Sequence, residues 1–357
     1  MSPEEESFFR RQIKVPEIGI LGQEKWKNSS VLIIGLGGLG CPASLYLALS
    51  GVGRLGLVDF DRVELSNLHR QTSFTQTDIG KPKTEVVSRF LKERSPWVRL
   101  ETFSSYITNR TDPKLFESWD LILDCTDTIS SKYAISDFCL IGSKPLVTAS
   151  VFRTSAQLAV FSGEGRPCYR CLYPHLEEGD TLSCSDAGVL GVQTALAGTY
   201  QASFALRYLL KPETIPTDRI YSLEWDSPFL FESKINPDPH CISCGEKKGL
   251  SKSEKQILEI SVEDYWNSKS TDTILMDVRE FEETESNPIP GSILFPLSRL
   301  EKEGTPELSG YKKIICICET GVRSKQAVRF LKTNTENYSL IGGRRSLQNF
   351  LQNQNTI

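Results

Sequence analysis

This chain of 357 residues lacks an apolar run long enough to cross a membrane. Its N-terminus, MSPEEESFFRRQ, lacks the basic-then-apolar pattern of a secretory signal peptide. It also lacks a basic excess, because 41 Lys and Arg stand against 45 Asp and Glu, for a formal net charge of −4. That balance argues against a general binder of nucleic acid or anionic membranes. We therefore expect a cytoplasmic protein with no nucleic-acid or membrane partner.

Histidine is scarce, with three residues that need no special role, but cysteine is not, with ten. In a cytoplasmic protein these cysteines are expected to be metal ligands, reactive thiols or small core residues rather than a disulfide framework. Four of them lie in predicted helices or strands and are expected to be buried: Cys41, Cys125, Cys139 and Cys316.

Apolar periodicity predicts an α/β protein. From residue 31, short β-rich runs alternate with helical stretches, which is typical of a parallel, doubly wound, Rossmann-like sheet. The expected strands are VLIIG, RLGLVDFD and WDLILDCTD, followed by an antiparallel strand at QLAVF. The expected helices are CPASLYLALSGVG, KPKTEVVSRFLKERSP and AGVLGVQTALAGTYQASFALRYLL.

A second, smaller α/β domain is expected after a linker. Apolar residues thin out in CGEKKGLSKSEKQ, where Gly, Ser and Lys accumulate. The predicted organisation is a domain at 1–249, a linker at 250–256 and a domain at 257–357. The last of these has strands at TILMDVRE and KIICICE and a helix at SKQAVRFLKT, enough for a small domain.

The first candidate site is the glycine turn in VLIIGLGGLG. Gly35, Gly37 and Gly40 have G-x-G-x-x-G spacing between a strand and a helix, where the backbone can approach a phosphate at the helix N-terminus. Asp59 follows 19 residues after Gly40, at the end of the next strand, where a carboxylate can bind ribose hydroxyls. Alone, this pattern fits an NAD-dependent oxidoreductase as well as an ATP enzyme.

Charged residues further along favour ATP. Arg70 and Lys83 follow the second strand in SNLHRQ and GKPK. Two cations beyond the first phosphates suit a triphosphate, because charge builds up on the departing pyrophosphate. Asp127, in LDCTDT, follows the third expected strand, where it can hold Mg²⁺.

These motifs, in this order, resemble the adenylyltransferases that activate ubiquitin-like sulfur carriers in molybdopterin and thiamine biosynthesis, relatives of the ubiquitin-activating enzymes. The resemblance runs from about residue 8 to 245. It implies adenylation of a carrier that ends in Gly-Gly, by a homodimer in which Arg11 reaches the γ-phosphate in the other subunit. Thr128 stands where the family usually has asparagine. The residues assigned to the nucleotide and its metal are Gly35, Gly37, Gly38, Gly40, Asp59, Asp61, Ser66, Asn67, Arg70, Lys83, Asp127 and Thr128.

Two C-x-x-C pairs predict a metal site. Cys168 and Cys171 lie in CYRC, and Cys241 and Cys244 lie in CISC. Two such pairs complete a closed tetrahedral Cys₄ site for Zn²⁺, which would staple the end of the first domain. A thioredoxin-like redox pair is the alternative for either half.

Cys184, in LSCSDAGVLG, lies in a polar segment just before an expected helix, whose dipole favours the thiolate. In the enzymes that the chain resembles, the matching cysteine can attack the acyl-adenylate or form a disulfide with the carrier. In others of that family it is dispensable. A covalent role and a structural role for Cys184 both stay open.

The last candidate site is the loop CETGVRS, after the apolar run IICI. Backbone N–H groups of a tight loop can point at the sulfur of Cys318, and Arg323 adds a fixed charge. Sulfur transfer and phosphate-monoester hydrolysis both use such a loop. Phosphatases of this design place five residues between cysteine and arginine, whereas four intervene here, and the smaller ring suits a single terminal sulfur.

With LMDVRE, IPGSILFPL and LIGGRRSLQNF, this loop resembles the rhodanese family from about residue 258 onward. The resemblance implies that Cys318 carries a persulfide, loaded by a donor such as a cysteine desulfurase, and that its sulfur converts the adenylated carrier to a thiocarboxylate. Glu319 replaces the family's usual basic residue, a change expected to alter the sulfur donor or weaken the use of thiosulfate. The alternative is a non-catalytic module that docks a ubiquitin-like partner.

Overall fold

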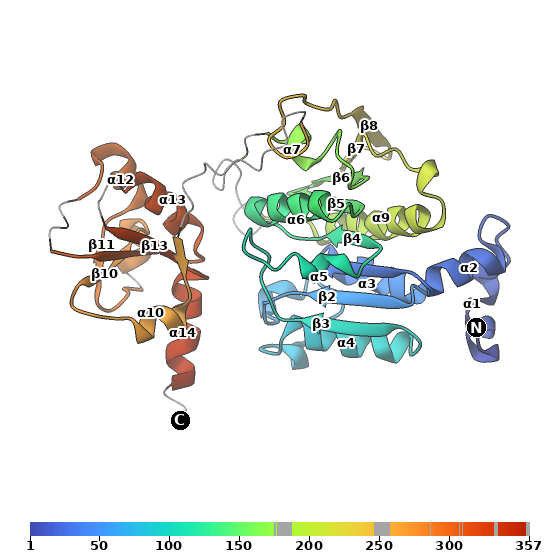
Figure 1. Ribbon diagram of the computed structural model, residues 1–357. Helices are drawn as coiled ribbons and strands as arrows, with labels where there is room; N and C mark the ends of the chain where they lie inside the picture. The colour runs from blue at the N-terminus through green and yellow to red at the C-terminus, as the bar shows by residue number, and fades with distance from the viewer. Residues whose placement is uncertain are drawn as a thin grey trace. The chain divides into compact units, whose positions relative to one another are not determined.

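The structure is a computed structural model that describes residues 1–174, 176, 188–245, 258–285, 287–306, 308, 310–331 and 335–354. The chain divides into two compact units, Met1–Leu250 and Ser251–Ile357, each with its own sheet (Figure 1). The mixed α/β fold expected from the sequence is confirmed. The expected linker at 250–256 lies outside the described residues, so the domain boundaries at 249 and 257 stay a prediction.

The first unit is built on an eight-stranded sheet with the order β3-β2-β1-β4-β5-β6-β7-β8. The strands from β3 to β5 pair in parallel, and β6, β7 and β8 add in antiparallel fashion. The order reverses around β1, and in such sheets ligands bind at that point, outside the carboxyl ends of the strands. The strands are β1 Ser30–Ile34, β2 Arg54–Val58, β3 Arg99–Phe103, β4 Leu121–Asp124, β5 Leu146–Phe152, β6 Ser155–Phe161, β7 Arg219–Glu224 and β8 Leu230–Lys234.

Helices cover both faces of this sheet (Figure 1). Successive side chains of a strand point to opposite faces, so Val31 and Ile33 pack with α3, α4 and α9, whereas Leu32 and Ile34 pack with α5 and α6. The helices are α1 Pro3–Ile13, α2 Gly19–Lys27, α3 Gly40–Leu49, α4 Lys83–Arg94, α5 Lys114–Glu117, α6 Ile129–Ile141, α7 Tyr169–Leu172 and α9 Gly191–Leu210, with the 3-10 turns η1 Leu65–Asn67, η2 Gln76–Asp78 and η3 Pro212–Thr214.

The expected strands and helices of the first unit are present, but the sequence patterns missed the strands β3, β5, β7 and β8 and the helices α1, α2, α5, α6 and α7. Strand β3 was missed because its sequence RLETF has only exposed and half-buried positions at the edge of the sheet and carries few apolar residues. The segment LILD, expected as the third strand, is therefore the fourth. The antiparallel strand expected at QLAVF is confirmed as part of β6.

The second unit has a five-stranded, all-parallel sheet with the order β11-β10-β12-β13-β9. The central strand β12 is apolar on both faces: Ile314 and Cys316 pack with α12 and α13, and Ile315 and Ile317 pack with α10 and α14. This explains the uninterrupted run IICI. The elements are β9 Leu258–Ile260, α10 Val262–Asn267, β10 Thr273–Asp277, α11 Phe281–Glu285, β11 Ser292–Leu294, α12 Leu297–Glu303, β12 Lys313–Ile317, α13 Val322–Phe330, β13 Glu336–Leu340 and α14 Gly343–Gln354.

The four cysteines expected in the core, Cys41, Cys125, Cys139 and Cys316, are buried. Burial raises the pKa of each of these thiols, which suppresses the thiolate and makes them poor nucleophiles. None of the helices in the described part of the chain combines the length and the apolar character that a membrane span requires.

Candidate functional site

The glycine turn between β1 and α3 is closely packed. Gly35 has φ of +91°, and a Cβ there would lie 2.7 Å from the carbonyl oxygen of Cys125. A Cβ on Gly40 would lie 1.9 Å from the carbonyl oxygen of Gly35, and one on Gly38 would lie 2.8 Å from Thr194 Oγ1. Gly37 has more room. The spacing of the glycines thus follows from a turn that leads directly into the N-terminus of α3.

Asp59 connects the end of β2 to this turn. Its Oδ2 accepts a hydrogen bond from the Leu36 amide at 2.7 Å, and its Oδ1 accepts one from the Asp61 amide at 2.8 Å. Burial, which desolvates the carboxylate, raises the pKa of Asp59, and the nearby Lys83 opposes that shift. The carboxylate therefore lies beside the glycine turn, at the carboxyl end of β2.

Lys83 brings a positive charge to the same place. Its ammonium lies 2.8 Å from Asp61 Oδ2, and its side chain is 6% exposed, whereas that of Asp61 is 48% exposed. Burial alone would lower the pKa of Lys83, but the carboxylates of Asp59 and Asp61 outweigh that effect and raise it. Lys83 is therefore a charged donor near the switch point of the sheet.

Arg70 follows η1. Its Nη1 donates to the Ser66 carbonyl oxygen at 2.8 Å and lies 2.9 Å from His69 Nε2. These contacts carry no negative charge, so the guanidinium can still attract an anion. Asn67 is buried, and its Oδ1 accepts a hydrogen bond from the Glu64 amide at 3.1 Å, which fastens this segment in place.

Asp127 and Thr128 lie in the loop between β4 and α6. The Asp127 side chain is exposed to solvent. The protein around it still limits its solvation and thereby raises the pKa of Asp127, and the nearby Asp61 carboxylate raises it further. Thr128 Oγ1 lies 3.1 Å from the hydroxyl of Tyr106, whose ring packs edge-on against Phe60 with 4.9 Å between centroids. The sequence patterns had not indicated the Phe60–Tyr106 pair.

A buried ion pair beneath this loop was also missed. Lys132 Nζ lies 2.9 Å from Asp124 Oδ2, with side-chain exposures of 5% and 1%. The other carboxylate oxygen of Asp124 accepts hydrogen bonds from the amide and the hydroxyl of Thr126, at 3.0 and 2.6 Å. The pair therefore fixes the start of the loop that carries Asp127. A lysine among the buried residues of the helix ISSKYAISDFCLI is the signal that could have indicated it.

Arg11 lies away from these residues. It is an exposed residue in the last turn of α1, and its neighbour Gln12 donates to the Ser50 carbonyl oxygen at 2.9 Å. Ser50 precedes β2, so this part of α1 lies at the amino ends of the strands, opposite the glycine turn. Within one chain the structure does not bring Arg11 to the candidate nucleotide site, and its role in a partner subunit stays a prediction.

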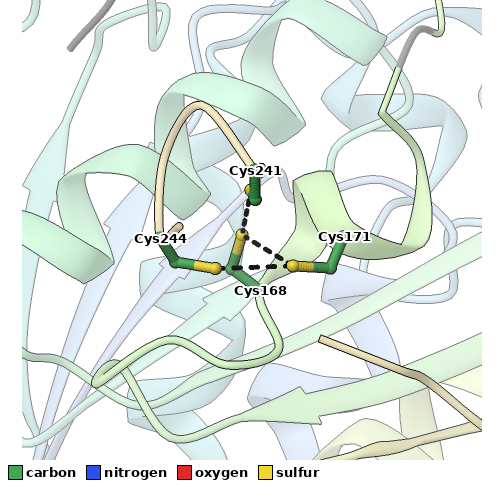
Figure 2. A group of neighbouring side chains, drawn as sticks. All are labelled: Cys168, Cys171, Cys241 and Cys244. Atoms are coloured by element: carbon green, nitrogen blue, oxygen red, sulfur yellow. Dashed lines mark hydrogen bonds between the residues drawn. The ribbon is translucent and has the colours of Figure 1, made fainter. Parts of the chain in front are cut away.

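The four cysteines of the C-x-x-C pairs come together (Figure 2). Their sulfur atoms all lie within 4.8 Å of one another. The Sγ–Sγ distance is 3.6 Å between Cys168 and Cys241 and 3.4 Å between Cys171 and Cys244. Four thiolates around one zinc ion are about 3.8 Å apart, given a Zn–S bond of about 2.3 Å. The cluster could therefore bind a metal ion. Cys184 lies outside the described residues.

Cys318 is cradled by backbone at the start of α13. Its Sγ accepts hydrogen bonds from the amides of Gly321 at 3.1 Å and Ser324 at 3.4 Å, and the residue is 1% exposed. Gly321 has φ of +97°, which turns the chain tightly around the sulfur. Arg323 was expected to add charge here, but its guanidinium donates to Glu283 at 2.5 and 2.6 Å. The described donors to the sulfur are thus neutral groups.

Comparison with known proteins matches both units. The ThiF family model matches residues 9–241, and the rhodanese-like domain model matches residues 261–349. The adenylyltransferase and sulfurtransferase MOCS3 of Anopheles gambiae is 34% identical over 363 residues, covering 93% of this chain and 82% of that protein. The adenylyltransferase and sulfurtransferase uba4 of Pyricularia oryzae is 33% identical, covering 91% of this chain and 80% of that protein.

Solved structures share the fold. A crystal structure of E. coli MccB superimposes with a TM-score of 0.60 at 24% identity, covering 69% of this chain and 75% of that one. A crystal structure of PaaA gives a TM-score of 0.56 at 21% identity, covering 67% of this chain and 76% of that one. At these identities the likeness concerns the fold alone.

Proposed function

This chain belongs to the ThiF family and, over both of its units, to the adenylyltransferase and sulfurtransferase proteins. From this membership we propose that it converts a ubiquitin-like sulfur carrier to its thiocarboxylate. The observation that carries the proposal is the presence of two suited sites in one chain. Arg70, Lys83 and Asp127 follow strands at the switch point of the first sheet, and Cys318 lies in a backbone cradle in the second unit.

In the first half-reaction, the C-terminal carboxylate of a carrier ending in Gly-Gly attacks the α-phosphate of ATP, and pyrophosphate leaves. The glycine turn and the N-terminus of α3 offer amide groups to the phosphates. Arg70 and Lys83 offset the negative charge that builds up on pyrophosphate. Mg²⁺, with Asp127 as its ligand, would screen the phosphates from one another.

In the second half-reaction, Cys318 carries a persulfide loaded by a donor such as a cysteine desulfurase. Its terminal sulfur attacks the acyl carbon of the adenylated carrier, and AMP leaves with the electron pair of the broken bond. A thiol reductant then attacks the Cys318 sulfur of the resulting acyl disulfide, so that the carrier thiocarboxylate leaves and Cys318 forms a mixed disulfide with the reductant. A second thiol attacks the reductant's sulfur in that disulfide, and Cys318 leaves as a thiolate that the Gly321 and Ser324 amides of the cradle stabilise.

We assign Zn²⁺ to Cys168, Cys171, Cys241 and Cys244, in a closed structural site. A ligand set of four thiolates leaves no open position for catalysis, so the ion would tie the loop after β6 to the end of the first unit. A homodimer, in which Arg11 of one subunit serves the site of the other, and a cytoplasmic location belong to the same proposal.

Carrier-dependent exchange of radiolabelled pyrophosphate into ATP tests the first half-reaction. We expect exchange with a carrier ending in Gly-Gly and none with the same carrier lacking its last glycine, which is the matched control. A titration of NADH fluorescence tests the oxidoreductase alternative, for which we expect no change. Absence of exchange with sulfur carriers of every pathway would leave the chain a docking module and contradict the proposal.

A further inference from the structure

The residue after the sulfur-carrying cysteine is an acid with basic partners. Glu319 accepts two hydrogen bonds from the guanidinium of Arg344, at 2.7 and 2.8 Å, and one from Arg345 Nε at 3.4 Å. Its Oε2 also lies 3.7 Å from Arg279 Nη1. The Arg344 hydrogen bonds lower the pKa of Glu319, so the carboxylate is charged at neutral pH.

The arginines beside the Cys318 loop are thus already paired with carboxylates. Arg344 is bidentate with Glu319, and Arg323, the cation of the loop itself, is bidentate with Glu283. Among the described residues, the groups that hydrogen-bond with the Cys318 sulfur are the Gly321 and Ser324 amides and the Ser324 hydroxyl at 3.7 Å. Amide dipoles can stabilise a negative charge on sulfur, and unpaired cations would add to the attraction for a dianion.

Donors of sulfane sulfur differ in the charge of their leaving group. With a persulfide R–S–SH, the Cys318 thiolate attacks the outer sulfur and the S–S bond breaks. The donor then leaves as the thiolate R–S⁻, while Cys318 becomes Cys–S–SH. With thiosulfate, the same attack on the outer sulfur expels sulfite, a dianion, and leaves Cys–S–S⁻. The second path places three negative charges at the loop in the transition state.

We propose that Glu319 makes Cys318 selective for persulfide donors over thiosulfate, because its carboxylate repels the dianion and occupies Arg344 and Arg345, which would otherwise receive sulfite. The inference rests on the proposed sulfur transfer and names its donor class. It assigns a specificity role to Glu319 and no contact with the reacting atoms.

The test uses the full-length chain and monitors the loading of Cys318 with sulfur by intact-mass measurement. It gives kcat/KM for two donors, cysteine persulfide and thiosulfate. We expect the parent to prefer the persulfide. Glu319→Gln, which keeps the shape and removes the charge, should raise kcat/KM for thiosulfate by about tenfold or more. Its kcat/KM for the persulfide should change by less than about threefold, which also shows that the variant folds.

Two further variants identify the cause. Glu303→Gln, which removes a carboxylate paired with Arg299 at an exposed site, is the control and should leave both donors unchanged. The double variant Glu319→Gln/Arg344→Gln should lose most of the gain, because the freed guanidinium is then absent. Equal use of both donors by the parent, or no gain in Glu319→Gln, would overturn the selectivity alone. Failure of Cys318 to take sulfur from either donor would overturn the sulfur transfer on which it rests.

Discussion

Replacing Lys132 by methionine should destabilise the first unit strongly. The change keeps an unbranched side chain and removes the ammonium, which lies 2.9 Å from Asp124 Oδ2 and donates to the Ala149 carbonyl oxygen at 2.7 Å. Thr126 and Thr148 still donate to the carboxylate, at 2.6 Å each from their hydroxyls. Asp124 is 1% exposed, so no water can replace the lost charge.

Removing one member of a buried ion pair costs about 3–5 kcal/mol, because the other charge is left uncompensated. We therefore expect a loss of about 3–5 kcal/mol at pH 7.

The assay is urea unfolding of the full chain at about pH 7, followed by tryptophan fluorescence. Lys81→Met is the matched control: Lys81 is 42% exposed, and its partner Asp78 keeps Arg89 at 2.6 Å. It should cost at most about 1 kcal/mol. A loss below about 1 kcal/mol in Lys132→Met, or an equal loss in both variants, would refute this reasoning.

The remaining expectations concern the other assigned sites. Metal analysis should find about one zinc ion per chain, lost in Cys241→Ser; a metal-free protein of full stability would rule out the Cys₄ site. Asp127→Ala should lower carrier-dependent pyrophosphate exchange at least about a hundredfold, and exchange near the parent rate would remove Asp127 from the site. Incubation with carrier and ATP should give a thiol-sensitive adduct that vanishes in Cys184→Ser, whereas full thiocarboxylate yield without any adduct would make Cys184 structural.

Features contained in one short segment could be predicted from the sequence. The G-x-G-x-x-G turn, the two C-x-x-C pairs and the loop after IICI each fix their own geometry over a few residues, because a tight turn leaves few alternatives for backbone and ligand directions. The strands with continuous apolar runs were predictable for a similar reason: β1, β4 and β12 are buried on both faces.

Apart from the meeting of the two C-x-x-C pairs, the contacts between distant segments described above could not be predicted. Glu319 meets Arg344 across 25 residues, and Tyr106 meets Thr128 across 22. Both contacts depend on the order of the strands in the sheet, which no local pattern states. Arg323 illustrates the same limit: the sequence places it in the sulfur loop, but its charge is engaged by Glu283, from 40 residues earlier.

The most direct test of the central claim, two sites acting in series, is one measurement on Cys318→Ala. The variant is incubated with carrier, ATP, a persulfide donor and a thiol reductant, while pyrophosphate exchange and the intact mass of the carrier are followed in the same reaction. Cys316→Ala, a change at a buried cysteine of the strand β12 that leads into the loop, is the control. We expect both variants to exchange pyrophosphate at the parent rate. Only the Cys316 variant should give the mass gain of one oxygen replaced by sulfur. Carrier conversion at the parent rate in Cys318→Ala, or loss of its exchange, would contradict the claim.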